Sequence, residues 1–277
     1  MKTSSYLAAG VALVVLIGTA GYLWREQQRS GATREAPPAP TVAAPPVLQP
    51  AASPASEPGI RYPIDTPVDK QAAATPLDVE TALAELFGSK TVLSMFQTRD
   101  FARRFVATVD NLGRSHAPVA VWPLNPTAGR LAVEKRDGHE VIGVDNGLRY
   151  TPFVLLVESV DLSKAVATYA RLYPLLQQAY EDIGFPKRYF NDRLVAVIDQ
   201  LLATPDVNEP LKIRLAQING PLQPERPWVM YEFEDPALQS LSAGQKILLR
   251  MGPVNERRMK SKLMEVRRLV TVAAVPR

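Results

Sequence analysis

The N-terminal segment of the chain carries the feature that most restricts how it can fold. No charged residue occurs between Thr3 and Trp24, and Leu, Val, Ala and Gly dominate the run. As an α-helix, such a run spans roughly 33 Å, enough to cross a hydrocarbon core of about 30 Å. Tyr6 and Trp24 lie near its ends, where aromatic rings favour the lipid headgroups. We therefore expect a short tail at residues 1–5 and an uncleaved transmembrane helix at residues 6–24.

The flanks of this segment leave its processing and orientation partly open. A cleaved signal peptide is the alternative, since residues 18–20 are small, but its positive region would consist of Lys2 and the amino terminus alone. Arg25 and Arg29 follow the segment, so the distribution of positive charge does not decide which side is inside. By analogy with the leader, span and tether of Gram-negative envelope proteins, we expect a single-pass protein of the bacterial inner membrane with a periplasmic domain.

A proline-rich segment follows at residues 25–60. Eight of the 25 prolines lie between Pro37 and Pro58, and Ala, Ser, Thr and Val fill most of the rest. This composition favours extended polyproline II and cannot build a core. About thirty residues at about 3.1 Å each would reach roughly 90 Å. We expect a disordered Pro/Ala-rich linker that acts as a passive spacer.

Residues 61–277 are long enough for one sizeable core, and we expect them to form a single soluble domain. Helical periodicity alternates here with short β-branched runs. Asp161 is expected to cap a long helix that Pro174 kinks or breaks and that Gly184 ends. Asp137-Gly138 predicts a hairpin turn. The predicted fold class is α+β and mostly helical, with a small antiparallel sheet.

Each predicted element shows either a helical or a two-residue apolar period. We expect helices at 77–87, 90–96, 98–112, 162–183, 191–203, 237–251 and 254–270, and strands at 119–124, 130–134, 140–144, 211–215 and 228–233. In the long helix, Tyr169, Tyr173 and Tyr180 share a face with leucines. We expect these tyrosines in the core and not on a stacking platform for a ligand.

The composition removes several classes of chemistry. The chain has no cysteine, which excludes disulfides, thiol nucleophiles and Cys-based metal sites, and its two histidines cannot form a histidine-rich metal site. No Gly-x-Ser-x-Gly, phosphate-binding Gly-rich or HExxH motif occurs. Ser115 and His116 are neighbours in sequence, which does not by itself make a nucleophile and its base. We therefore expect no cofactor, no metal and no enzymatic activity, although a carboxylate pair assembled by folding stays open.

Two segments share a pattern of Asp-Asn, a glycine and then Arg: Asp110-Asn111-Leu112-Gly113-Arg114 and Asp145-Asn146-Gly147-Leu148-Arg149. One interpretation is a pair of Asx-type turns, because Asp and Asn bond to nearby backbone amides and Gly adopts positive φ. The other is a pair of loops whose arginines bind a carboxylate or phosphate. Asp100 precedes Arg104 by one helical turn and is placed to neutralise it. The candidate anion- or partner-binding residues are Arg103, Arg104, Asp110, Asn111, Arg114, Asp145, Asn146 and Arg149.

The C-terminal segment is strongly basic. From Lys246 to Arg277 the net charge is +7, so the preceding residues carry −3 of the total of +4. The last predicted helix combines an apolar stripe with basic residues that fall mostly on its other faces. A solvated basic face is one interpretation, and contact with anionic lipid or an acidic partner is the other. The candidate contact residues there are Arg257, Arg258, Lys260 and Lys262. Nucleic acid is not an expected partner, since no recognised binding fold is present.

Five segments together resemble the bacterial family known as domain of unknown function 3014. They are RRFVATVDNLGR at 103–114, NGLRYTPFV at 146–154, YPLLQQAYEDIGFP at 173–186, VIDQLLATP at 197–205 and QKILLRMGPVNERRMKSKL at 245–263. The resemblance implies an N-terminal membrane span, a Pro/Ala tether and this domain. It implies no activity, ligand or catalytic residue.

These observations favour a membrane-anchored envelope protein that is not an enzyme and whose soluble domain binds a protein or an anionic envelope component. An envelope enzyme acting on cell-wall or glycan material is the alternative. A third possibility is a protein on the inner face that uses its basic helix on membrane or nucleic acid.

Overall fold

The computed structural model describes residues 59–65, 76–217 and 229–272. The predicted tail, the transmembrane helix at 6–24 and nearly all of the linker at 25–60 lie outside these ranges. Within them, no helix combines the length and the apolar composition that crossing a membrane requires.

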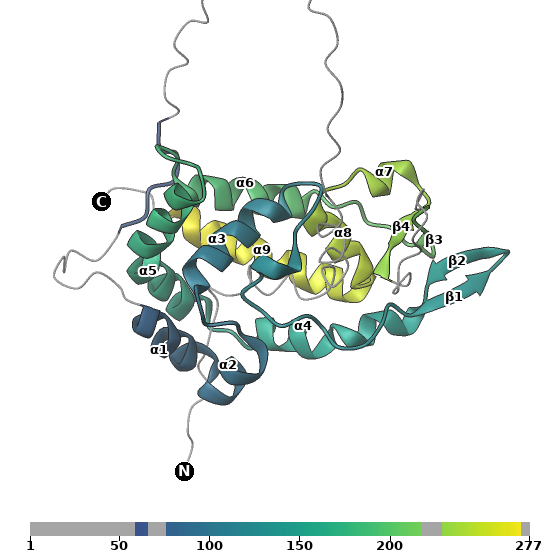
Figure 1. Cartoon of the computed structure of the whole chain (residues 1–277), viewed down its shortest axis with the longest axis horizontal. Coiled ribbons are helices and arrows are strands. Elements are labelled where there is room, and N and C mark those ends of the chain that lie inside the picture. Colours follow the sequence, from purple (N-terminus) through teal and green to yellow (C-terminus); the bar gives the residue numbers. More distant parts are fainter. Residues whose placement is uncertain (1–58, 66–75, 218–228, 273–277) are drawn as a thin grey trace, which may run out of the picture.

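The described residues form an α+β fold that is mostly helical, with one small sheet at one end (Figure 1). This confirms the predicted fold class for these residues. The α-helices are α1 (Pro76–Phe87), α2 (Ser89–Met95), α3 (Phe101–Leu112), α4 (Thr151–Glu158), α5 (Leu162–Asp182), α6 (Phe190–Leu202), α7 (Pro236–Gln239), α8 (Ala243–Arg250) and α9 (Pro253–Val272). The strands are β1 (Val133–Arg136), β2 (His139–Ile142), β3 (Lys212–Leu215) and β4 (Tyr231–Phe233), and two 3₁₀ helices are η4 (Val119–Val121) and η5 (Val144–Arg149).

Helix α9 is the central element of the helical part, and it packs against α4, α5, α6 and α8. Figure 1 shows α9 running between α6 and α4. The apolar stripe expected from the sequence, Met259, Leu263, Val266 and Val270, is buried. Burial of that stripe, and not helix propensity alone, is what stabilises a helix with so many charged residues.

Helices α3 and α5 contribute the other predicted apolar faces. Phe101, Phe105, Val109 and Leu112 of α3 are all buried, as their helical spacing predicts. Tyr169, Tyr173 and Tyr180 of α5 are buried in the same core cluster. The prediction that these tyrosines belong to the core is confirmed.

The ends of α5 follow local sequence signals, but its middle does not. The Asp161 carboxylate accepts hydrogen bonds from the backbone amides of Ser163 and Lys164, which makes it the expected N-cap. Gly184 adopts a φ of 109° just beyond the C-terminus. We expected Pro174 to kink the helix or break it in two; it lies inside one helix of 21 residues, so the break is wrong and the kink stays a prediction.

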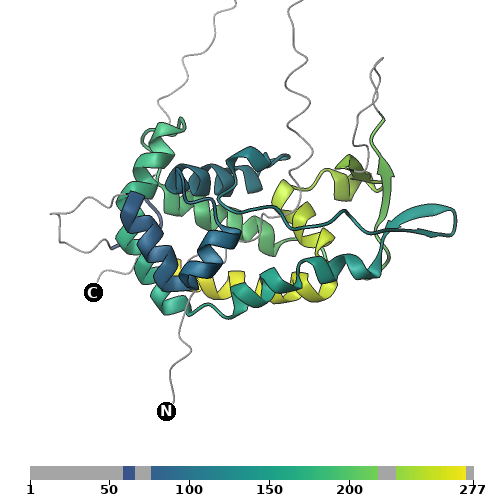
Figure 2. The same ribbon diagram turned by 60° about the horizontal axis from the view of Figure 1, so that its bottom comes forward.

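The sheet is antiparallel throughout, in the order β1-β2-β3-β4. Asp137 and Gly138 have φ values of 51° and 81°, which is the pattern of a type I′ turn and confirms the predicted hairpin. The hairpin projects away from the helices (Figure 2). Ile213 and Phe233 of the sheet bury against Leu249 of α8 and form a second, small core.

Two predicted elements are wrong. Residues 119–124 do not form a strand: Val119–Val121 is a 3₁₀ turn, and only Leu124 makes an isolated bridge, to Phe96. Pro118 precedes this run and Pro123 lies within it, and neither can donate a ladder hydrogen bond. The helix expected at 237–251 is divided into α7 and α8, because Ser242 and Gln245 form a capping box that starts a new helix.

Candidate functional site

The segment 110–114 forms the last turn of α3 and its end, and its charged residues serve that junction. Asp110 is buried, accepts a hydrogen bond from Arg193 Nε at 2.8 Å and forms an ion pair with Arg114 at 2.6 Å. Arg193 also donates to the Asp110 carbonyl. A Cβ at Gly113 would lie 2.9 Å from the Arg193 guanidinium, so the glycine leaves room for it. Asn111 bonds back to the Ala107 carbonyl.

The segment 145–149 forms η5, where Asn146 and Arg149 tie three stretches of chain together. The buried Asn146 side chain accepts from the Ala132 amide and from Arg149, and it donates to the Arg250 carbonyl. Arg149 also donates to the carbonyls of Ala128 and Gly129. Asp145 is exposed. Segment 110–114 lies at the end of α3 and segment 145–149 forms η5, but neither has the features of the predicted Asx-type turn. Gly113 has a φ of −78°, Gly147 is not among the glycines of positive φ, and Asn146 accepts from Ala132, which is distant in sequence.

The two arginines at the start of α3 differ in their surroundings. Arg104 donates to the carbonyls of Arg99, Ala120 and Trp122, and it makes no ion pair with Asp100 in the described part of the chain. Arg103 is exposed. The structure gives Arg104, Arg114 and Arg149 no common partner, so it does not bring the candidate arginines into one site. Their role in binding an anion stays a prediction.

Most basic residues of α9 are engaged by acidic residues of the same domain. Arg258 pairs with Glu158 of α4, and this hydrogen bond lowers the pKa of the Glu158 carboxyl. Lys260 lies 2.9 Å from Asp206 and also pairs with Glu256. The remaining predicted contact residues are Lys262, which pairs with Glu265 at 3.3 Å, and the exposed Arg257.

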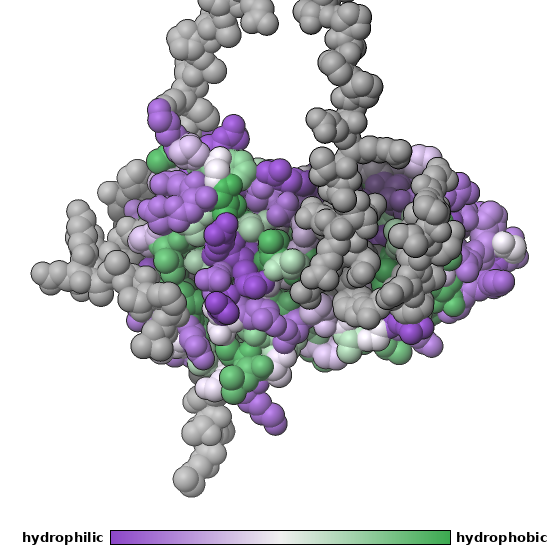
Figure 3. Space-filling view, viewed as in Figure 1, coloured by the Kyte–Doolittle hydropathy of each residue, from purple (hydrophilic) through white to green (hydrophobic). Residues whose placement is uncertain are grey.

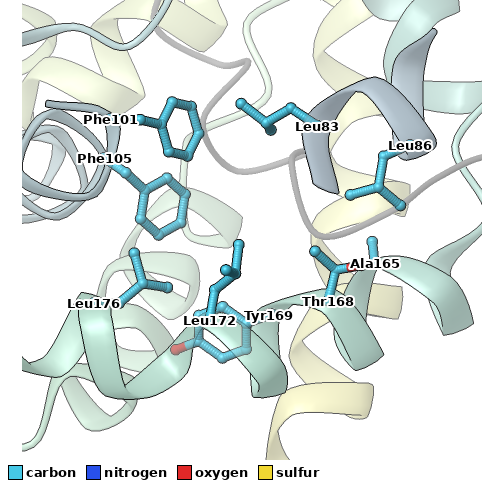
Figure 4. Close-up of a pocket in the computed structure, with 9 residues that line it drawn as sticks. All are labelled: Leu83, Leu86, Phe101, Phe105, Ala165, Thr168, Tyr169, Leu172 and Leu176. Atoms are coloured by element: carbon cyan, nitrogen blue, oxygen red, sulfur yellow. The ribbon is translucent and has the colours of Figure 1, made fainter. Parts of the chain in front are cut away.

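A small apolar pocket lies between α1, α3 and α5 (Figure 4). Its volume is about 30 Å³, about a tenth of the roughly 300 Å³ at which small-molecule pockets begin. Its nine lining residues are apolar except for Thr168 and Tyr169, and the Tyr169 hydroxyl already donates to Asn191. A pocket this small holds no ligand of ordinary size.

A larger cavity of about 280 Å³, which we name the junction cavity, lies where the sheet meets the turn between α8 and α9. Three stretches of the chain line it: residues 136–147 of the hairpin and η5, residues 207–211 before β3, and residues 249–256. Its apolar lining residues include Ile142, Val207, Leu211 and Leu249, which belong to the second core. Figure 3 shows a mixed hydrophilic and hydrophobic surface over the visible described residues.

The charged residues of the junction cavity have different environments. Glu256 is buried, which raises the pKa of its carboxyl, and its Oε1 atom lies 2.8 Å from the Lys260 ammonium without hydrogen-bond geometry. Arg250 packs its guanidinium over the Phe233 ring at 4.9 Å and donates to the Tyr231 carbonyl at 3.3 Å. Burial lowers the pKa of this guanidinium. Glu209 is exposed at the same cavity.

Sequence reasoning missed the junction cavity almost entirely. Of its lining residues, only Asn146 was a candidate, and it was chosen for a turn pattern. The residues come from stretches about sixty and forty positions apart, and no local spacing relates them. Arg250 carried a weak signal, as a basic residue next to the Gly252-Pro253 helix break.

Comparison with known proteins places the chain in a family without assigning a reaction. No curated protein and no solved structure matches it. One family model matches, that of the Protein of unknown function (DUF3014), and the match covers residues 101–267. The matched range runs from α3 to α9 and omits only the last turn of α9. All lining residues of the junction cavity lie within it. Because the match covers more than half of the chain, the protein belongs to the DUF3014 family.

Proposed function

We propose that the chain is a single-pass inner-membrane protein whose periplasmic domain binds another envelope component and catalyses no reaction. The charge-free run at residues 6–24 and the proline-rich residues 25–60 support the anchor and the tether. The junction cavity supports the binding role. It is close to the size of a small-ligand site, and apolar walls surround a few polar groups, as in most binding pockets.

The experiment that tests the binding role compares a filled cavity with an open one. The full chain is purified from solubilised membranes as wild type, as Val207→Trp and as Leu93→Trp. Val207 lines the junction cavity, whereas Leu93 is 79% exposed on α2 and serves as the matched control. We expect a specific set of captured envelope components that Val207→Trp loses and Leu93→Trp keeps. A capture profile equal to that of residues 1–60 alone would overturn the proposal.

The proposed location has its own test. A reporter that is active only outside the cytoplasm is fused after Arg277, and a second reporter that is active only inside serves as the control. We expect activity from the first fusion and none from the second. The reverse result would reject the periplasmic domain.

Contact with anionic lipid by α9 is a secondary proposal within the same function. Arg257 and Arg268 are exposed and make no ion pair among the described residues. If they touch the membrane, Arg257→Gln with Arg268→Gln should reduce the protection of α9 from a water-soluble label in vesicles containing phosphatidylserine. Equal labelling of wild type and double variant would exclude this contact.

One observation favours the enzymatic alternative. Glu209 and Glu256 both line the junction cavity, one exposed and the other buried with a raised pKa, and such different environments can separate a base from an acid. The adjacent Lys260 ammonium opposes this role, because it favours the ionised form of Glu256 at neutral pH. Release of sugar from cell-wall material by wild type but not by Glu256→Gln would favour the enzyme.

A further inference from the structure

Among the described residues, two charged side chains of the junction cavity form no ion pair: Arg250, and the exposed Glu209. Arg136 pairs with Glu134 at 3.1 Å, and Glu256 pairs with Lys260. Arg250 lies within 4 Å of no carboxylate in the ranges that the structure describes. A guanidinium has five N–H donors, and within the described ranges Arg250 forms one side-chain hydrogen bond, so most of its donors are not used by those residues.

A second cation on α8 adds to this positive charge. Lys246 precedes Arg250 by one helical turn and is buried, with its ammonium donating to the Gln239 carbonyl at 3.2 Å. Among the described residues it also has no carboxylate within ion-pair distance. Burial and the nearby Arg250 lower the pKa of the Lys246 ammonium, and the Glu232 carboxylate of β4 opposes this shift from beyond ion-pair distance. Two neighbouring cations that are only partly solvated favour an anion nearby.

The rest of the cavity restricts which anion fits. Ile142, Leu211 and Leu249 offer an apolar wall, which suits a ligand with an apolar body. Glu209 and Glu256 line the same cavity, so a dianion such as phosphate would be repelled more strongly than a monoanion. The lining therefore matches one negative charge next to an apolar group.

We infer that the junction cavity binds a monocarboxylate attached to an apolar group, with Arg250 as the residue that receives the carboxylate. This inference rests on the proposed binding function and specifies its ligand. A guanidinium binds a carboxylate through two parallel hydrogen bonds, and Leu249 and Ile142 would cover the apolar group.

The test uses two probes that differ only in the charged group. N-acetyl-leucine and N-acetyl-leucinamide are titrated separately into the full chain in nanodiscs, and ligand-observed NMR measures their affinities. We expect the acid to bind at least about tenfold more tightly than the amide, because a hydrogen-bonded charge is lost in the amide. Equal affinities, or no binding of the acid, would overturn the inference. Inorganic phosphate that competes as strongly as the acid would also overturn it.

Variants locate the binding. Arg250→Gln should remove the preference for the acid, Arg250→Lys should keep part of it, and Arg171→Gln should keep all of it, since Arg171 is exposed on α5 and lines no part of the cavity. A preference for the acid that survives Arg250→Gln would overturn the role of Arg250. If partner capture still depends on an open cavity while the probes do not bind, the ligand class is wrong and the binding function stands.

Discussion

The strongest prediction about stability concerns Asp110, which the sequence suggested as a ligand-binding residue. Its carboxylate is 7% exposed, accepts a hydrogen bond from Arg193 and forms a second ion pair with Arg114. We expect Asp110→Asn to destabilise the domain, because the neutral amide leaves the partly buried Arg193 without its counter-charge.

The magnitude follows from the exposure of the three side chains. Removing one partner of a fully buried ion pair costs about 3–5 kcal/mol. Arg193 is 28% exposed and Arg114 is 53% exposed, so water recovers part of the loss. We expect about 2 kcal/mol for Asp110→Asn, which corresponds to a decrease in Tm of roughly 4–8 °C for a domain of this size.

The assay is urea unfolding of the full chain in detergent, followed by tryptophan fluorescence. Asp199→Asn is the matched control, because Asp199 pairs with Arg267 and both side chains are more than a third exposed. That control should lose less than about 1 kcal/mol. If Asp110→Asn loses no more free energy of unfolding than Asp199→Asn, the reasoning about burial is refuted. A double-mutant cycle with Arg193→Gln should give a coupling of about 1–2 kcal/mol.

Three further changes have defined outcomes. Gly244→Ala should lower Tm, because its Cβ would lie 2.4 Å from a Leu201 methyl, and overpacking costs about 1–3 kcal/mol against a helix-propensity gain of about 1 kcal/mol. Asn146→Ala removes three hydrogen bonds and should reduce the free energy of unfolding by about 2–4 kcal/mol, measured in urea. Glu158→Gln should cost less than about 1 kcal/mol at pH 7. Because the Arg258 hydrogen bond lowers the pKa of Glu158, the difference should persist below the usual carboxylate range and vanish as the pH falls through the lowered folded-state pKa, measured as urea unfolding of both proteins over a series of acidic pH values.

Features of the fold that depend on a few adjacent residues were predictable from the sequence. Asp161 caps α5 through its own neighbours, and Asp137-Gly138 closes a hairpin because both residues accept positive φ. The division between α7 and α8 also had a local signal, since Ser242 and Gln245 have capping-box spacing.

Features that depend on tertiary partners were not predictable. Residues 119–124 have strand-like composition, but only Leu124 forms a β-bridge, and Trp122 packs into the helical core instead.

The same limit applies to the candidate site. Arg104 and Arg149 look like anion-binding residues in the sequence, yet backbone carbonyls of distant loops occupy their donors. Nothing in a local pattern shows which carbonyls lack a partner until the chain is folded.

The basic excess of the C-terminal segment is a property of the sequence more than of the folded surface. Arg258, Lys260 and Arg267 form ion pairs with carboxylates that precede residue 245. Part of the net charge of +7 in the C-terminal segment is therefore neutralised by acidic residues of the preceding chain, whose net charge is −3. On α9, Arg257 and Arg268 remain exposed. At about 1 kcal/mol for each basic residue near an anionic surface, they would supply about 2 kcal/mol, far less than the whole excess would give. Lipid contact of that strength would assist a membrane anchor at residues 6–24 and could not replace it.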